Sequence, residues 1–404
     1  MKNRSRVLAQ VVLLLFVFLG CSEDARQSSS AAKAVLDADP ASTILEIFGE
    51  PDRFARTEKL ISVLRAIPAD QTHAFEEALN GLDFPNRELD RVLVITAWAK
   101  HDAAAATKWA KNKERVDIVR NAMFAESVYV WALEDHESFL SDMEMALYLL
   151  PGIDASILRA LIKGWFDSGG ENLEAYIHDM TPQSMDRQRA VDTLVKIKTA
   201  RDGAAAMIEW AKALRGDNYY KASVYSRVAA AVVLIDSKRV LDWCAEICDS
   251  EIGKEMPHMI AAAWVAQSGE EAMDFIASQP NAVGVRTGAR AAYRRFIRAD
   301  PDRAFAWIET LTEEQRRGPV MQGPVGFYVT QRSALGYPLQ AIEWLDYLQD
   351  ETYREAATTT IMRRWLRTDE SAAEAWMAQS SMSEEAKLDA HQNHGPKSFR
   401  KRRS

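Results

Sequence analysis

The chain has little cysteine, glycine and proline, and these shortages narrow the kinds of protein it can be. Only three of its 404 residues are cysteines, so a framework of several disulfides cannot hold the fold together. Its 18 glycines and 13 prolines are few for this length, and alanine is abundant, which favours helix. Hydrophobic residues make up 48% of the chain, which is enough for a core and excludes global disorder.

The sequence also lacks the short motifs that carry common chemistry. It contains no H-E-x-x-H, no G-x-S-x-G, no G-x-x-x-x-G-K-[ST] and no G-x-G-x-x-G that opens a helix after a strand. None of the seven histidines has a cysteine close enough in sequence to suggest a zinc ligand set. We therefore predict no catalytic residues, no cofactor and no metal site, and hence a protein that is not an enzyme.

Residues 1–20 have the features of an export signal. Three bases open the segment, an apolar run from Val11 to Leu19 follows, and Gly20 precedes Cys21. A positive head, a short apolar run and a small residue before cleavage are typical of a signal peptide, and the run is too short to span a bilayer. Residues 21–42 are polar and small enough to form a flexible linker.

The Leu19-Gly20-Cys21 ending resembles the lipobox of bacterial lipoproteins, in which the cysteine is lipidated and becomes the new N-terminus. Phe18 departs from that pattern, since leucine is usual there. Ser22 after the cysteine resembles the outer-membrane sorting class. The resemblance implies lipidation at Cys21 and a place in the cell envelope, facing the periplasm and attached to the outer membrane. An ordinary signal peptide cut elsewhere, or an unprocessed anchor, is the alternative.

Acidic residues outnumber bases along most of the chain. Without residues 1–20, which hold three bases and no acid, 47 bases stand against 58 acids, a net charge of −11. An acidic body argues against nucleic-acid binding. Five of those bases gather near the C-terminus, in a segment that is either a solvated, disordered end or a tether to anionic lipid or envelope polymer. They are Lys397, Arg400, Lys401, Arg402 and Arg403.

One short unit recurs along the chain after about residue 43. Its clearest copies are residues 296–307 (FIRADPDRAFAW) and 365–376 (WLRTDESAAEAW). Each has an aromatic residue, a turn former four residues on, a small residue at plus eight and a second aromatic at plus eleven. Asp300-Pro301 is typical of a helix N-cap followed by proline at the first helical position. The unit is therefore predicted to be two antiparallel helices joined by a turn.

The residue before the turn returns at a nearly constant period. The copies stand 34, 33, 34, 34, 33, 32, 32, 37 and 32 residues apart, at Leu64, Trp98, Trp131, Trp165, Thr199, Val232, Trp264, Phe296, Ser333 and Trp365. The plus-eleven residue is aromatic in every copy except the third, which has Asp142. Two helices of this length bury only one face, so neighbouring copies have to pack on each other.

This period and pairing resemble the tetratricopeptide-like class of α-solenoids over residues 43–385, and also exported bacterial proteins with DP-x-x-A-x-x-W repeats. The tetratricopeptide consensus itself does not fit these columns, so the resemblance implies architecture and no binding residues. We predict an all-α fold, an α-solenoid of about ten antiparallel helical hairpins with a period of 32–37 residues. Residues 386–404 are predicted to form a basic, disordered tail.

The period breaks once, where it rises to 37 residues before Ser333. The extra residues include two Gly-Pro pairs, at 318–319 and 323–324, which cannot continue a helix. A protruding loop or a kink in the stack is therefore expected, and surface loops on rigid scaffolds often carry recognition. A neutral insertion is the alternative.

The residues around this break combine two bases with apolar side chains, a mixture that is enriched at protein interfaces. We predict a partner-binding loop here, made of Arg316, Arg317, Val320, Met321 and Val325.

Three other sets of residues favour structure over chemistry. The turn aspartates recur no more than once per copy, so they would lie about 10 Å or more apart, and N-capping explains each one. The periodic tryptophans are interpreted as core residues and not as a ligand groove. Cys244 and Cys248 are four apart on a predicted helix, where the Cα atoms are about 6 Å apart and the Cβ vectors are poorly aimed, so separate thiols are expected.

The pattern as a whole favours a membrane-anchored, non-catalytic scaffold that binds another protein of the cell envelope. Two alternatives stay open. One is a polysaccharide-active enzyme on an α/α toroid, which would need a deep cavity lined by carboxylates. The other is a structural spacer that joins the membrane to the cell wall through its basic tail.

Overall fold

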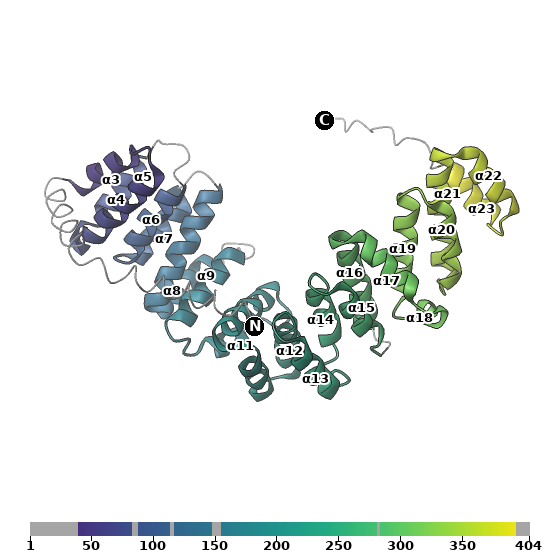
Figure 1. Ribbon diagram of the computed structural model, residues 1–404. Helices are drawn as coiled ribbons and strands as arrows, with labels where there is room; N and C mark the ends of the chain where they lie inside the picture. The colour runs from purple at the N-terminus through teal and green to yellow at the C-terminus, as the bar shows by residue number, and fades with distance from the viewer. Residues whose placement is uncertain (1–38, 83–87, 114–116, 148–154, 281–282, 393–404) are drawn as a thin grey trace, which may run out of the picture. The chain divides into compact units, whose positions relative to one another are not determined.

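The computed structural model describes residues 39–82, 88–113, 117–147, 155–280 and 283–392, and within these residues the regular structure is helical, without strands (Figure 1). The predicted all-α class is confirmed there. The helices are α3 (Pro40–Phe48), α4 (Arg53–Ala66), η1 (Ala69–Gln71), α5 (His73–Asn80), α6 (Glu88–Ala99), α7 (Ala103–Lys113), α8 (Asp117–Leu147), α9 (Ala155–Asp167), α10 (Leu173–Asp179), α11 (Met185–Ala213), α12 (Asn218–Val232), α13 (Ser237–Ile247), α14 (Met256–Trp264), α15 (Gly269–Ala277), α16 (Val283–Ala299), α17 (Pro301–Thr310), α18 (Glu313–Arg317), α19 (Gln322–Ala334), α20 (Pro338–Glu343), η2 (Leu345–Tyr347), α21 (Glu351–Thr368), α22 (Glu370–Gln379) and α23 (Glu384–Gln392).

The turn aspartates cap helices, as the sequence predicts. The carboxylate of Asp300 accepts a hydrogen bond from the backbone N–H of Arg303 at 3.1 Å, and Asp369 does the same for Ala372. Asp135 interrupts α8, where its backbone leaves the helical region at φ −155° and ψ 83°. Each carboxylate satisfies a backbone N–H that has no partner at the start of a helix, which stabilises the turn.

Three copies without a turn aspartate use glycine instead, and one of these glycines is Gly169, at φ 119° and four residues after Trp165. Gly203 breaks α11 at φ 78°, four residues after Thr199, and Gly336 lies before α20 at φ 88°, three residues after Ser333. Glycine adopts this left-handed backbone without a steric penalty. The copies marked by Thr199 and Ser333 therefore still turn at the expected place.

The described residues divide into two compact units, one that ends at Leu194 and one that begins at Val195. In the first unit α6 packs against α4, α7 and α8, and α8 packs against α9. Phe75 and Trp109 of the plus-eleven column lie buried in its core beside Trp98. The ring centroids of Trp98 and Trp109 are 6.3 Å apart. Phe75 and Trp109 of the aromatic column are core, as predicted, whereas Tyr176, the third aromatic member in this unit, is half-buried.

The second unit repeats one packing arrangement along the chain. The helices α12, α14, α16, α19 and α21 contact each other in that order. Each of them also contacts the helix that follows its turn, which is α13, α15, α17, α20 or α22 (Figure 1). Helical pairs are thus the packing element of this unit, and each pair lies against the next.

Polar contacts recur at sequence separations close to the period of the copies. In the first unit the Arg56 guanidinium pairs with the Asp90 carboxylate, 34 residues away, at 2.8 Å between Nε and Oδ2. In the second unit the contacts at separations of 33 or 34 residues include Lys212 with Glu246, Arg303 with Glu270, Trp307 with Asp274, Arg295 with the Ala262 carbonyl and Arg364 with the Thr330 carbonyl. Residues in equivalent or nearby positions of neighbouring copies therefore contact each other.

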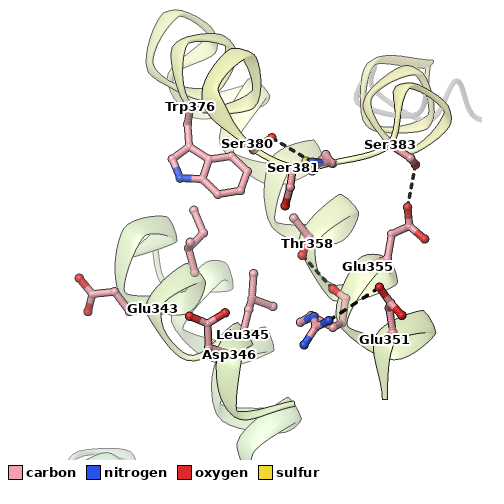
Figure 2. A pocket seen from close by; sticks show the side chains of 13 residues that line it. Glu343, Leu345, Asp346, Glu351, Glu355, Thr358, Trp376, Ser380, Ser381 and Ser383 are labelled. Carbon is pink, nitrogen blue, oxygen red and sulfur yellow. Dashed lines mark hydrogen bonds and ion pairs between the residues drawn. The ribbon is translucent and has the colours of Figure 1, made fainter. Parts of the chain in front are cut away.

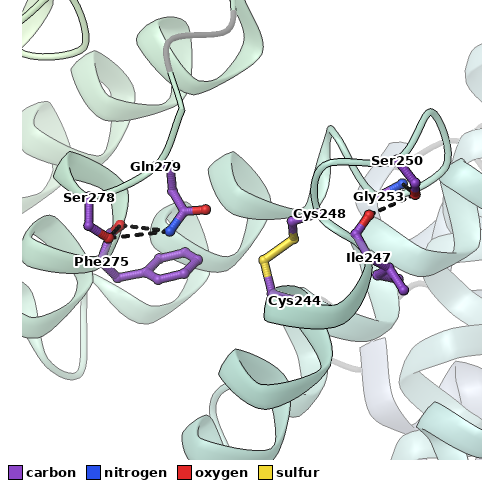
Figure 3. The surroundings of a disulfide bond; sticks show 8 residues. All are labelled: Cys244, Ile247, Cys248, Ser250, Gly253, Phe275, Ser278 and Gln279. Atoms are coloured by element: carbon purple, nitrogen blue, oxygen red, sulfur yellow. Dashed lines mark hydrogen bonds between the residues drawn. A yellow bond between two sulfur atoms is a disulfide. The ribbon is translucent and has the colours of Figure 1, made fainter.

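Cys244 and Cys248 form a disulfide, so the prediction of separate thiols is wrong. α13 ends at Ile247, and Cys248 is its C-cap residue. The two Cα atoms lie 4.9 Å apart, closer than the roughly 6 Å of a regular helix and within the range that a disulfide spans. Figure 3 shows the bond on the side of α13 that faces Phe275 and Gln279.

The helical region extends further than the sequence predicts at its C-terminal end. The boundary expected between residues 385 and 386 falls inside α23, which continues to Gln392. Ala386 and Ala390 of this helix are buried, and the Asp389 carboxylate pairs with Arg363 of α21 at 2.9 Å. Residues 386–392, which the sequence assigned to the tail, therefore form a helix that packs on α21, and residues 393–404 lie outside the described residues.

Candidate functional site

The predicted partner-binding segment is mostly helix. The residues that lengthen the period form α18 and a turn, which contains the first Gly-Pro pair. The second pair does not break a helix, because Pro324 lies in the first turn of α19, where its missing N–H needs no partner. The protruding loop expected from the sequence is therefore replaced by a short helix and a turn.

The apolar half of that segment is not at the surface. Val320, Met321 and Val325 are 6%, 2% and 0% exposed, so all three belong to the core. These three side chains therefore contribute to core packing. The prediction that they form part of a partner-binding loop at the surface is corrected. Helix periodicity is disturbed by the Gly-Pro pairs, so the sequence did not show which side of this segment faces inwards.

The two arginines of the segment contact residues in η2 and just before it. The Arg316 guanidinium lies over the Trp344 ring, 4.4 Å from its centroid, and donates a hydrogen bond to the Tyr347 hydroxyl at 3.2 Å. Arg317 donates to the Asp346 carbonyl at 2.8 Å. Such contacts hold η2 against α18. Partner binding by this segment stays a prediction.

The other predicted site residues lie outside the residues that the structure describes. These are the lipidation site Cys21 and the tail bases Lys397, Arg400, Lys401, Arg402 and Arg403.

A pocket of about 610 Å³ lies near the end of the second unit. It is bounded by α20 with η2, by α21, and by α22 with the turn that leads to α23 (Figure 2). The volume is within the range of ordinary ligand sites, which is about 300–1,000 Å³. The pocket is thus large enough for one or two long side chains of a bound peptide.

Carboxylates dominate the charge of this pocket. Its acidic residues are Glu343, Asp346, Glu351 and Glu355, and all four are exposed. Arg354 is the one base among the lining residues, and its Nη2 lies 4.0 Å from Oε1 of Glu351. The pocket therefore has an excess of negative charge that attracts cations.

The four carboxylates differ in how they are already engaged. Glu355 accepts a hydrogen bond from the Ser383 hydroxyl at 2.7 Å, and Glu351 faces Arg354. Within the described part of the chain, neither Glu343 nor Asp346 is in an ion pair. These two side chains are thus the ones available to a cation that enters from solvent.

Trp376 provides the aromatic surface of the pocket. It comes from α22, where it is the plus-eleven residue of the last copy, and its side chain is half-buried. Figure 2 shows its ring directed into the pocket, opposite Leu345 and Asp346. An aromatic face beside carboxylates favours guanidinium and ammonium groups, which gain a cation–π contact together with ion pairs.

The sequence did not reveal this pocket, for a geometric reason. Its residues come from three stretches, around 342–346, 351–358 and 376–383, which helix packing brings together. The periodic pattern assigned Trp376 to the core, because the column to which it belongs is mostly buried. The acidic excess of the chain was the one available signal, and it does not point to a position.

Among the described residues, no group of three or more histidine, cysteine or acidic side chains is placed to hold a metal ion. No helix of that part of the chain is both long and apolar enough to cross a bilayer. A scan against protein-family models and searches of curated proteins and of solved structures found no match to this chain.

Proposed function

We propose that the protein is a lipid-anchored helical-repeat scaffold of the bacterial cell envelope that holds a partner protein by a basic segment. In this proposal the helical pairs form an α-solenoid of about ten hairpins, and Cys21 carries the lipid at the periplasmic face of the outer membrane. The order of contacts among the first helices of the pairs and the polar contacts at 33–34 residues support a repeat stack.

The observation that carries the binding function is the acidic pocket beneath Trp376. A basic segment of a partner would place an arginine or lysine between Trp376 and the unpaired carboxylates of Glu343 and Asp346. Because these groups are near the surface, salt would weaken the contact strongly. The pocket therefore predicts a modest, reversible affinity suited to an adaptor.

The experiment that tests this proposal uses the chain from residue 21 onward with Cys21→Ser and a fluorescein-labelled octapeptide of six lysines, one phenylalanine and one glycine. Fluorescence anisotropy measures its affinity. We expect Glu343→Gln/Asp346→Asn to weaken binding at least tenfold, because both free carboxylates are lost.

The matched control is Glu271→Gln/Glu314→Gln, which removes two exposed carboxylates of the same unit outside the pocket. Binding should then change by less than about twofold, by the Coulomb and screening argument. Equal weakening by both pairs of substitutions would mean that the peptide follows net charge alone, and the proposed site would be rejected.

One observation favours a second candidate, the polysaccharide-active enzyme. Carboxylates and an aromatic ring also line the clefts of glycoside hydrolases. The four carboxylates here are exposed, whereas a general acid in such enzymes is normally desolvated. Release of reducing ends from purified envelope polysaccharide, abolished by Glu343→Gln, would establish the enzyme. No release, together with peptide binding, supports the scaffold.

The spacer alternative predicts that the pocket substitutions have no effect on binding. A spacer would bind envelope polymer through its basic tail, and Glu343→Gln/Asp346→Asn would leave that binding unchanged.

A further inference from the structure

We propose that the acidic pocket is the docking site of the chain's own basic segment, residues 397–403, which competes there with the partner. This inference rests on the proposed function, since both use the same pocket. Three observations carry it: the charge of the pocket, the charge of the segment, and the place where α23 starts and ends.

The charges are complementary and locally concentrated. The pocket has four carboxylates and one base among its lining residues. The segment 397–403 (KSFRKRR) has five bases and no acid, in a chain whose remaining charge after residue 20 is 42 bases against 58 acids. It also contains Phe399, an apolar side chain that can contact Trp376 and Leu345.

The geometry places the segment within reach. Ser383 lines the pocket, and α23 begins at the next residue. α23 has nine residues, so its end lies only about 13 Å along its axis from its start. Five further residues lead from Gln392 to Lys397 and span up to about 16 Å when extended. Lys397 and the four bases beyond it can therefore return to the pocket.

A tethered occupant of this kind competes effectively even when its contacts are weak. A short linker gives an effective concentration of about 1 mM. A segment with an intrinsic dissociation constant of about 100 μM would then lower the apparent affinity of an added basic peptide about tenfold. The pocket would be filled until a partner with a stronger basic segment, or an anionic surface that attracts the tail, displaces it.

The test compares the full chain from residue 21, carrying Cys21→Ser, with the same chain in which Lys397, Arg400, Lys401, Arg402 and Arg403 are all changed to Gln. The labelled lysine octapeptide is titrated into both. We expect the neutral-tail variant to bind it about tenfold more tightly. This gain should disappear when Glu343→Gln/Asp346→Asn is added, because the pocket then binds neither segment.

A direct readout is disulfide trapping between Ser381→Cys, beside the pocket, and Ser398→Cys in the segment. We expect rapid trapping that falls several-fold when Glu343→Gln/Asp346→Asn is added. Equal peptide affinity with and without the tail charges, together with slow trapping, would overturn the inference while pocket binding stands. Absence of any pocket-dependent peptide binding in the neutral-tail variant would overturn the proposed function as well.

Discussion

Trp307 shows how a single residue of the repeat stabilises two neighbouring pairs. Its ring is 5% exposed, and its Nε1 donates a hydrogen bond to the Asp274 carboxylate of the preceding pair at 2.8 Å. The ring of Tyr293 lies 6.0 Å from it, between centroids, on the first helix of the same pair. One side chain therefore fills the space within its own pair and also contacts the pair before it.

Trp307→Ala should lower the free energy of unfolding by about 3–5 kcal/mol, because a buried ring is lost and a cavity is left. Chemical denaturation followed by circular dichroism measures this. Leu339→Ala, at a site that is 57% exposed, is the control and should change it by less than about 0.5 kcal/mol. A loss below about 1 kcal/mol for Trp307→Ala would show that the aromatic column is not core.

The buried ion pair of the first unit gives a second prediction at this scale. Arg56 and Asp90 are 4% and 1% exposed, and Arg56 also donates to the Glu50 carbonyl at 2.7 Å. Asp90→Ala should cost about 3–5 kcal/mol in unfolding free energy, since it leaves a buried guanidinium without its counter-charge.

The double change Arg56→Met/Asp90→Leu should be less destabilising than Asp90→Ala alone, because no charge is then left unpaired in the core. Urea denaturation of the unchanged chain, of Asp90→Ala and of the double variant measures the three unfolding free energies. A double variant at least as unstable as the single one would contradict the view that an unpaired charge, and not lost packing, is the main penalty.

At the scale of elements, the segment that lengthens the period is part of the packing. α18 and the turn after it hold Met321 in the core and connect Arg316 to Trp344. Replacing Gly318–Gly323 by a glycine-serine link should therefore lower the melting temperature clearly. An unchanged melting temperature with lost partner capture would instead restore the recognition loop.

A sharper comparison uses two substitutions in the same turn. Met321→Ala should lower the unfolding free energy by about 2–5 kcal/mol, while Pro319→Ala, at an exposed site, should change it by about 0.5 kcal/mol or less.

The sequence predicted those elements whose cause is local. Asp300 and Asp369 lie where a helix must start, so the turns follow from capping chemistry alone. The disulfide depended on where α13 ends, because Cys248 is its cap and the Cα atoms approach more closely than in a regular helix. Hydrophobic periodicity does not determine the end of a helix to within one residue.

The pocket depended on contacts between elements. Trp376 and Asp346 are thirty residues apart and meet only because α22 packs on α21 beside η2. A column of mostly buried aromatics gave no sign that its last member would line a pocket. The candidate site was therefore outside what sequence reasoning offered.

For the whole molecule, the first prediction concerns the membrane. If Cys21 carries the lipid, Cys21→Ala should release the protein into the soluble fraction and abolish labelling by a fatty-acid analogue. The neutral-tail variant is the control and should stay attached, because the lipid alone holds the chain. Continued labelling of Cys21→Ala would reject the lipoprotein assignment.

The central claim is that the pairs form one repeat stack, and small-angle X-ray scattering of the chain from residue 21 with Cys21→Ser tests it most directly. Ten layers of about 10 Å give a length near 100 Å and a radius of gyration of about 30 Å. A compact chain of this size would give about 21 Å. We predict a radius of gyration close to the value of about 30 Å for the stack. A radius close to the value of about 21 Å for a compact chain would contradict the repeat stack.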